Sequence, residues 1–257
     1  MMVWSSGDPE TGRQVRVTVP SRDALLRDIA QRLDAAEGFS LATLNLDHVV
    51  KLRRDPAFRA AYARHGLVTA DGNPIVWLHR LAGRRIELVQ GADLVRPVAA
   101  LAGRLGIRVG LLGATGPTLH AAAARLEAEC PGLEIVTRIA PPPRFDPEGA
   151  AADACLEQLR AAGVGLCFVA LGAPKQERLA ARGLERVPGC GFVSIGAGLD
   201  FLAGGQKRAP PWVRRIAMEW AWRMLGNPRR LARRYARCAL VLPQLAAEAA
   251  QARRESA

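Results

Sequence analysis

The sequence predicts an α/β protein with a largely parallel, Rossmann-like sheet flanked by helices, followed by a C-terminal basic amphipathic helical appendage. Short apolar runs alternate with stretches of helical periodicity, which is the pattern of β-α-β units. Several of these runs, such as residues 165–172, are almost continuously hydrophobic, as expected for strands that are buried on both faces. The appendage is predicted from a concentration of basic residues that begins near residue 206.

Seven apolar runs are the predicted strands. In chain order they cover residues 14–19, 40–45, 66–70, 107–113, 133–139, 165–172 and 191–196. Ser21 and Asp23 are suited to open a helix after the first run. Later helices are predicted over residues 117–130, 147–163 and 173–187. In a sheet of this kind ligands bind beyond the carboxyl ends of the strands, so polar residues that follow a strand are the candidates for a site.

The tail of the chain is basic and apolar at once. Between residues 207 and 237 the basic side chains are Lys207, Arg208, Arg214, Arg215, Arg223, Arg229, Arg230, Arg233, Arg234 and Arg237, and the one acid is Glu219. One helical face is predicted from Val213, Ile216, Ala217, Trp220 and Met224. After a break at residues 226–228 a second is predicted from Leu231, Tyr235, Cys238 and Leu242, with the arginines around the other side. The pattern is typical of an interfacial membrane segment, and it also fits a helix packed on the body with a solvated basic face.

Two polar clusters follow the first strands after the amino-terminal run. Thr43 and Asn45 end one strand, where they can cap a helix or position a ligand. Asp71 follows the next strand, and Gly72 beside it relaxes the backbone. These residues form an ordinary turn, or they place a carboxylate on the active face as a general base.

Glycines and polar residues follow three later strands. Gly113 lies between a strand and a helix, where it permits close approach of a phosphate, although the pattern is not G-x-G-x-x-G. Lys175 and Gln176 begin a helix after the central strand, where they can meet a ligand or face solvent. Gly196 opens a glycine-rich segment that leads into the tail.

Composition excludes several classes of protein. The 257 residues are 49% hydrophobic, but no apolar run reaches the roughly 18–20 residues that span a bilayer. The first residues lack the layout of a signal peptide, so we expect a cytoplasmic protein. The five cysteines are widely spaced without C-x-x-C, and we expect reduced thiols, no metal site and no cofactor. The net charge of +12 points to an anionic partner for the tail.

Taken together, the clusters resemble the WecG/TagA/CpsF family of bacterial glycosyltransferases, from about residue 15 to residue 240. The resemblance rests on T-x-N at 43–45, ADG at 70–72, GADL at 91–94, LLG at 111–113, LGAPKQE at 171–177, GAGLDFLAG at 196–204, RAPPW at 208–212 and EWAWRMLGNPRR at 219–230. The family transfers a sugar, with inversion, from a UDP-sugar to a sugar linked to polyprenyl pyrophosphate. Such lipid intermediates build surface polysaccharides and teichoic-acid linkage units.

The resemblance implies roles for individual residues. Asp71 resembles the catalytic base, Thr43 and Asn45 the groups that position substrate beside it, and Gln176 a residue of the matching segment. Arg223, Arg230 and Arg233 match arginines of an appendage that closes over the active site and touches the membrane. We therefore expect residues 1–205 to form the catalytic domain and residues 206–257 the appendage, with Trp212, Arg215, Trp220 and Trp222 at the membrane.

The partners expected are the UDP-sugar donor, the lipid-linked acceptor and the anionic inner face of the cell membrane, where the protein would be peripheral. No Asp-x-Asp occurs, so arginines of the tail are expected to compensate the leaving diphosphate instead of a metal. The chain departs from the family at Leu88 and Gln90 and at residues 141–146, which leaves the donor open among N-acetylmannosamine, glucose and a uronic acid.

Two other classes of function are compatible with parts of the sequence. A basic, aromatic-bearing tail binds nucleic acid in some proteins, but no recognition module is evident, so no nucleic acid is expected. A non-catalytic scaffold of a polysaccharide assembly complex is the other alternative, and the presence of Asp71 argues against it. A homo-oligomer is left open.

Overall fold

The computed structural model describes residues 14–206, 209–226 and 228–255. In this part of the chain six strands form one sheet in the order β2-β1-β6-β5-β3-β4, and every neighbouring pair is parallel. The strands are β1 (Phe39–Leu44), β2 (Leu67–Ala70), β3 (Arg108–Gly113), β4 (Glu134–Ile139), β5 (Leu166–Ala170) and β6 (Gly191–Ser194). The predicted fold class and six of the seven predicted strands are confirmed.

The prediction of a strand over residues 14–19 is wrong. Its valines are buried alternately, as in a strand, but the segment forms no ladder. The N–H groups of Thr18 and Val19 both donate to the single carbonyl of Val68, at 3.0 and 3.2 Å. The Thr18 hydroxyl accepts from the N–H of Val68 at 2.8 Å and donates to the carbonyl of Gly66 at 2.9 Å. The hydroxyl of Thr18 therefore makes two hydrogen bonds to the backbone of residues 66–68 that backbone groups would make in a strand.

Helices cover both faces of the sheet. One face packs against α1 (Arg22–Asp34), α5 (Gly91–Arg104), α6 (Gly116–Glu129) and α9 (Gly198–Leu202). The other packs against α2 (Leu46–Leu52), α3 (Pro56–Ala63), α7 (Ala150–Ala161) and α8 (Lys175–Arg186). The helices predicted over 117–130, 147–163 and 173–187 correspond to α6, α7 and α8, and Ser21 caps α1 by accepting from the N–H of Ala24.

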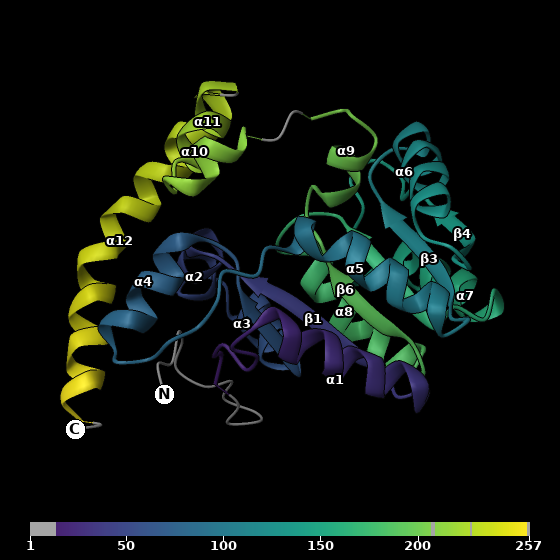
Figure 1. Ribbon diagram of the computed structural model, residues 1–257, viewed down its shortest axis with the longest axis horizontal. Helices are drawn as coiled ribbons and strands as arrows, with labels where there is room; N and C mark the ends of the chain where they lie inside the picture. Colours follow the sequence, from purple (N-terminus) through teal and green to yellow (C-terminus); the bar gives the residue numbers. More distant parts are fainter. Residues whose placement is uncertain (1–13, 207–208, 227, 256–257) are drawn as a thin grey trace.

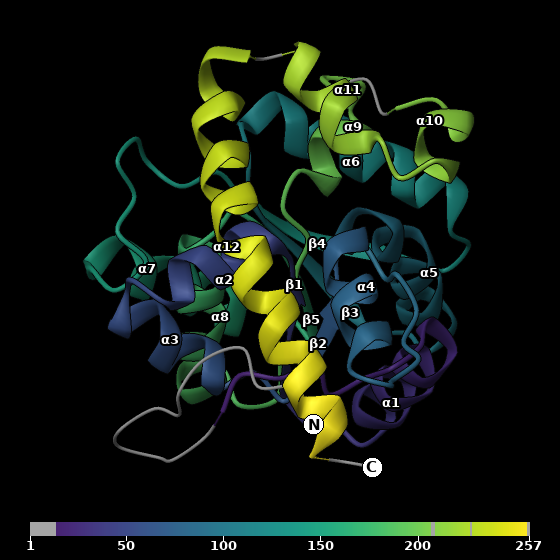
Figure 2. The same cartoon turned by 90° about the vertical axis from the view of Figure 1, so that its left-hand side faces the viewer.

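The described residues of the tail form three helices, α10 (Pro211–Arg215), α11 (Glu219–Gly226) and α12 (Pro228–Arg254). Figure 1 shows α10 and α11 beyond the strand ends, and α12 descending past α4 (Asn73–Leu81). In Figure 2, α12 runs in front of the β2 edge of the sheet. Lys207, Arg208 and Asn227 lie outside the described residues.

The single helical face predicted from Val213 to Met224 is interrupted. Ala217 adopts a left-handed conformation with φ 60°. The N–H of Met218 donates to the carbonyl of Val213 and the N–H of Ala217 to that of Arg214, which is the Schellman ending of a helix. As a result Val213 is buried, whereas the side chain of Ile216 is 60% exposed. Alanine occupies a position where glycine is usual, so no sequence signal marked this end.

The second predicted face, on α12, is confirmed. Leu231 and Cys238 are buried, and Tyr235 and Leu242 are half-buried. Further along, Leu245 and Ala249 are fully buried in the core that α2, α3 and α4 share. The lower half of α12 is therefore part of the hydrophobic core of the body.

All five cysteines are buried and their thiols are free. None of the helices in the described residues combines the length and apolar character that crossing a bilayer requires.

Candidate active site

A cavity of about 1140 Å³ lies between the carboxyl ends of the strands and the tail helices. Residues that directly follow β1, β2, β5 and β6 line it, namely Asn45, Asp71, Leu171, Gly172, Ile195 and Gly196. The adjacent strands β1 and β6 are followed by α2 and α9, which pack on opposite faces of the sheet. The cavity therefore opens at a topological switch point, where such folds bind ligands.

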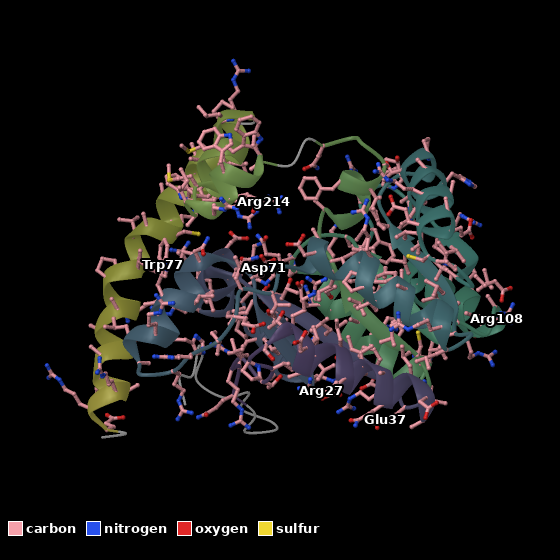
Figure 3. All side chains as sticks on the ribbon, in the orientation of Figure 1. Arg27, Glu37, Asp71, Trp77, Arg108 and Arg214 are labelled. Carbon is pink, nitrogen blue, oxygen red and sulfur yellow. The ribbon has the colours of Figure 1, made fainter. Side chains whose placement is uncertain are left out.

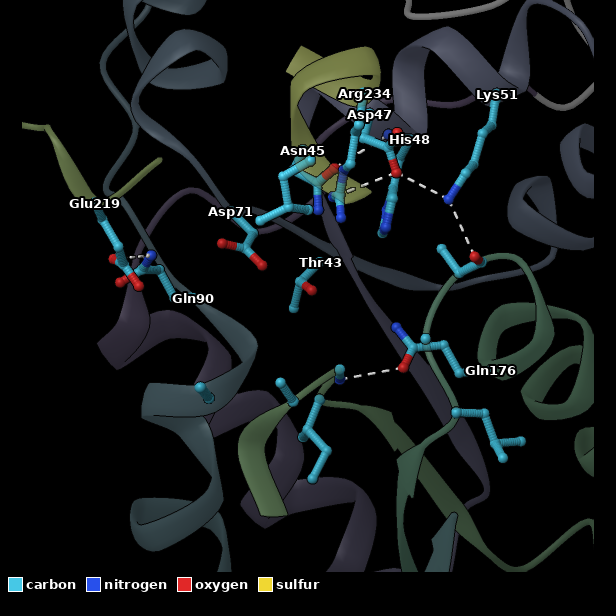
Figure 4. A pocket seen from close by; sticks show the side chains of 18 of the residues that line it. Thr43, Asn45, Asp47, His48, Lys51, Asp71, Gln90, Gln176, Glu219 and Arg234 are labelled. Carbon is cyan, nitrogen blue, oxygen red and sulfur yellow. Dashed lines mark hydrogen bonds and ion pairs between the residues drawn. The ribbon is translucent and has the colours of Figure 1, made fainter. Parts of the chain in front are cut away.

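The sheet brings Asp71 next to the end of β1. Leu44 pairs with Ala70 across the two strands, and the N–H of Asp71 donates to the carbonyl of Leu44 at 2.7 Å. Gly72 has φ 127°, which lets the chain turn from β2 into α4 directly after the carboxylate. Asp71 is half-buried, and its carboxylate lies on the cavity wall near Asn45 and Thr43 (Figure 4).

Thr43 and Asn45 both line the cavity, but they differ in what else they do. Asn45 Oδ1 accepts from the N–H of His48 at 3.1 Å, so Asn45 also caps α2. Thr43 is buried on β1, and a side chain in place of Gly91 would come within 3.3 Å of its hydroxyl. The glycine of the GADL motif therefore lets α5 approach this part of the site.

Gln176 and Gly196 meet across the cavity floor. Gln176 Oε1 accepts from the N–H of Gly196 at 3.1 Å, and Gln176 Nε2 donates to Glu177 Oε1 at 2.8 Å. Two other predicted binding residues, Lys175 and Gly113, are not among the residues that line the cavity. A side chain at Gly113 would lie 2.3 Å from the carbonyl oxygen of Ala170, so close packing of β3 against β5 explains this glycine.

Tail residues form the opposite wall. Arg233, Arg234 and Arg237 from α12 line it, together with Trp222 and Leu225 from α11. Arg233 is one of the arginines expected to meet the substrate, whereas Arg234 and Arg237 were expected only on the basic side of the helix. All three reach the cavity because α12 crosses the open end of the sheet. In Figure 3, the side chain of Arg214 lies on the side of α10 that faces the body. The side chains of Arg223 and Arg230 lie outside the described part of the structure.

An ion-pair network joins α2 to α12. Asp47 Oδ2 lies 2.8 Å from Lys51 Nζ and 3.3 Å from an Arg234 guanidinium nitrogen (Figure 4). Burial would raise the pKa of Asp47, but the charges of Arg234 and Lys51 outweigh it and hold the pKa below its usual range. Sequence analysis missed this network, although Asp47 and Lys51 stand one helical turn apart directly after the T-x-N motif.

A second link closes the cavity on another side. Gln90 Nε2, before α5, donates to Glu219 Oε2, at the start of α11, at 3.1 Å. The two residues are 129 positions apart, so no local pattern predicts the contact. Gln90 is one of the positions where the sequence departs from the family that it resembles, and here it joins the tail to the body.

Two buried titratable groups lie at the cavity, where His48 lines the wall and Glu177 lies behind it. Burial, helped by the charge of Lys51, lowers the pKa of His48 to about 3, so His48 is neutral. Burial raises the pKa of Glu177 to about 7, against the opposing effect of its hydrogen bond from Gln176. His48 Nε2 and Glu177 Oε1 are 3.9 Å apart, too far for a hydrogen bond.

The residues predicted to face a membrane lie on the tail helices. The side chains of Trp212, Trp220 and Trp222 are 65%, 45% and 38% exposed, and Arg215 is exposed as well. Trp220 also meets the ring of Tyr235 edge-on, with centroids 5.8 Å apart. Trp222 belongs to the cavity wall as well as to the surface.

Basic and acidic side chains both line the cavity. Its cations are Lys51, Arg54, Arg233, Arg234 and Arg237, and its acids are Asp47, Asp55, Asp71, Asp200 and Glu219. Because Asp47 already pairs with Lys51 and Arg234, Arg233 and Arg237 are the tail cations outside this ion-pair network. Within the described residues, His, Cys, Asp and Glu side chains do not gather in threes as a metal site would require. Arginine and lysine bind phosphate oxygens by charge-assisted hydrogen bonds, which suits a diphosphate ligand.

Sequence comparison finds a matching family model and a similar bacterial protein. Residues 12–256 match the model of the glycosyl transferase WecG/TagA/CpsF family. The chain is also 25% identical over 199 residues to the N-acetylglucosaminyldiphosphoundecaprenol N-acetyl-beta-D-mannosaminyltransferase of Bacillus subtilis (strain 168). That alignment covers 76% of this chain and 75% of the relative.

Proposed function

Because the chain belongs to the WecG/TagA/CpsF family of glycosyltransferases, we propose that it moves a sugar from a UDP-sugar to a sugar on polyprenyl pyrophosphate, with inversion. The observation that carries this proposal is a single cavity with Asp71 on one wall and the arginines of α12 on the other. At about 1140 Å³ it exceeds the roughly 300–1,000 Å³ of ordinary ligand pockets, which leaves room for a donor and the head of an acceptor.

Asp71 acts as the general base in this mechanism. It accepts the proton of the acceptor hydroxyl as that oxygen attacks C1 of the donor sugar. The new bond forms on the face opposite the departing diphosphate, so the configuration at C1 inverts. The bond from C1 to the phosphate oxygen breaks, and UDP leaves with its electron pair. Thr43 and Asn45 stand beside Asp71 and orient the acceptor.

Arginines balance the charge of the departing UDP. Arg233 and Arg237 line the cavity, and their guanidinium groups suit the diphosphate oxygens. Arg223 on α11 and Arg230 on α12 are assigned to this task from the family resemblance alone. Because these cations take the place of a bound metal, transfer is metal-independent in this proposal.

The tail also holds the enzyme at the membrane. Trp212, Trp220 and Trp222 present aromatic surface beside Arg215, the combination that lies at the boundary of an anionic bilayer. Trp222 reaches both this surface and the cavity wall. The lipid-linked acceptor would thus meet the cavity at the level of the membrane, with the enzyme peripheral on its inner face.

The decisive experiment is a transfer assay with purified protein and a polyprenyl-pyrophosphate-linked N-acetylglucosamine acceptor. UDP-N-acetylmannosamine is the first donor to test because of the Bacillus relative, beside UDP-glucose and a UDP-uronic acid. We expect one donor to yield a disaccharide lipid and the yield to persist in excess EDTA. Loss of activity in EDTA that magnesium or manganese restores would contradict metal independence. No product from any donor, with binding of the lipid or of nucleic acid retained, would favour a scaffold or a nucleic-acid-binding protein.

A further inference from the structure

Glu177 is a buried carboxyl group that the proposed mechanism does not use. It lies in the first turn of α8, and its side chain is fully buried behind the cavity wall. Glu177 Oε1 accepts from Gln176 Nε2 at 2.8 Å, whereas Glu177 Oε2 has no hydrogen-bond partner among the described residues. A buried carboxyl with an unpaired oxygen destabilises a fold, so its presence here calls for a reason other than stability.

The surroundings of Glu177 do not supply that reason. His48 on α2 is neutral and 3.9 Å away, and its Nδ1 faces the hydroxyl of Tyr62 on α3 at 3.4 Å. Lys51 and Asp47, also on α2, act on Glu177 through their charges in opposite directions. The direct contact of its carboxylate is with the side-chain amide of Gln176, the neighbouring residue that lines the cavity.

The hydrogen bonds of Gln176 select one orientation of its amide. Its oxygen accepts from the N–H of Gly196 and its nitrogen donates to Glu177. If the amide were flipped, its nitrogen would face a donor at Gly196 and its oxygen would face the carboxylate of Glu177. Both partners therefore enforce the same orientation, and Figure 4 shows the amide nitrogen on the side of the cavity where Thr43 and Asp71 lie.

We propose that Glu177 is a positioning residue, which holds the amide of Gln176 so that its second N–H points into the cavity as a donor to a substrate oxygen. The inference rests on the proposed function, because the substrate oxygen would belong to the sugar or diphosphate bound there. A side-chain amide has two hydrogens on its nitrogen, and Glu177 takes one of them. Burying Glu177 lowers the stability of the fold, and in return the site has a hydrogen-bond donor with a fixed direction.

The unaltered protein provides the first test. In a sample labelled with ¹⁵N-glutamine, the two hydrogens of Gln176 Nε2 give separate signals. We expect one to exchange slowly with solvent, because it is bound to Glu177, and the other to exchange fast and to shift when UDP is added. Equal exchange of both hydrogens would overturn the inference, whether or not the enzyme transfers sugar.

Variants provide the second test. Glu177→Met removes the acceptor at similar length and should lower kcat/KM about tenfold, the scale of one lost hydrogen bond. Glu177→Gln keeps an acceptor oxygen and should stay within about threefold of wild type, or roughly 0.7 kcal/mol. If Glu177 acts through Gln176, then adding Glu177→Met to Gln176→Ala should cause no further loss. Ser194→Ala, which removes another buried and unpaired oxygen outside the cavity lining, is the control and should leave kcat/KM unchanged.

The outcomes separate the inference from the function on which it rests. Full activity of Glu177→Met, or a loss that adds to that of Gln176→Ala, would overturn the positioning role. A wild-type protein that transfers no sugar would overturn the proposed function, and the exchange measurement would still decide the role of Glu177. If Glu177→Met does not fold, Glu177→Leu takes its place in the cycle.

Discussion

At the scale of single residues, the position of Asp71 follows from the strand that precedes it. Its N–H is bonded to the end of β1, and a glycine with positive φ follows it, so the carboxylate has a fixed place on the cavity wall. Neither constraint involves the carboxyl group itself, so both remain in place when that group alone is changed.

We predict that Asp71→Asn folds like wild type and loses at least about 100-fold in kcat, the scale expected when a general base is removed. Turnover with the preferred UDP-sugar measures the loss, and thermal unfolding verifies the fold. Asp28→Asn on α1, outside the cavity lining, is the matched control. Near-normal turnover of Asp71→Asn would exclude Asp71 as the base.

Arg233 offers a comparison within one helix. Arg233 lines the cavity, whereas Arg229, also exposed on α12, does not. With a short, water-soluble acceptor, Arg233→Ala should lower kcat/KM by about 10- to 100-fold, as expected for a lost charge-assisted hydrogen bond of roughly 1.5–3 kcal/mol. Arg229→Ala should retain full activity in the same assay. Equal activity of the two variants would remove Arg233 from the diphosphate site.

The pKa of Glu177 gives stability a dependence on pH. Burial raises this pKa from an ordinary 4.5 to about 7, so between these values the folded protein binds a proton that the unfolded chain releases. This group therefore stabilises the fold less as pH rises through that window. We predict that the difference in unfolding temperature, Glu177→Gln minus wild type, is a few degrees larger at pH 7.5 than at pH 5. A difference that stays flat over this range would contradict the raised pKa of Glu177.

At the scale of elements, the regular parts of the chain were predictable and the irregular parts were not. Strands buried on both faces reveal themselves as apolar runs, which is why β1 to β6 were predicted within a few residues. Residues 14–19 instead alternate polar and apolar side chains, as a half-buried strand does, but the Thr18 hydroxyl takes the place of ladder hydrogen bonds. The end of α10 could not be predicted from the sequence because Ala217 occupies a position where glycine is usual.

The residues of the candidate site were also predictable only in part. Asp71, Thr43, Asn45, Gln176 and Gly196 were predictable because they stand at or after the ends of strands, and their roles stay predictions. Contacts that depend on how the tail crosses the sheet, such as Gln90 with Glu219 and Asp47 with Arg234, join residues far apart in sequence and left no local signal.

The short helices α10 and α11 carry the proposed membrane surface. Arg215→Ala should weaken binding to vesicles of anionic lipid by roughly 1 kcal/mol, about fivefold. Trp212→Ala should weaken it further because this side chain is 65% exposed and loses its apolar contact with lipid. Co-sedimentation with vesicles measures both effects, and turnover of a soluble acceptor should be unchanged. Arg27→Ala, on the opposite side of the molecule from α10 and α11 in Figure 3, is the control, and equal binding by all three variants would contradict a membrane role for α10.

At the scale of the whole molecule, α12 joins the cavity to the core. We predict that Leu245→Ala, which empties a fully buried position shared with α2 and α4, destabilises the protein by about 2–5 kcal/mol. Leu240→Ala on the same helix, where the side chain is 80% exposed, should leave the unfolding temperature unchanged. Equal unfolding temperatures would mean that the tail is a separate unit, as a domain boundary at residue 205 predicts. A marked difference would mean that deleting the tail damages the body, so truncation alone cannot test the role of the appendage.

The continuity of α12 also limits how this protein can vary in length. Arg233 and Arg237 face the cavity and Leu245 and Ala249 face the core, on one helix that continues through Pro243. Each inserted residue turns the two halves relative to each other by about 100° and shifts them by about 1.5 Å. An insertion between residues 237 and 245 would thus swing the arginines out of the cavity while the core held the other half in place. Steps of about seven residues, close to two full turns, would restore the phase, although they would displace the arginines by about 10 Å along the axis. The number of residues between Arg237 and Leu245 therefore determines whether the arginines of α12 reach the active site.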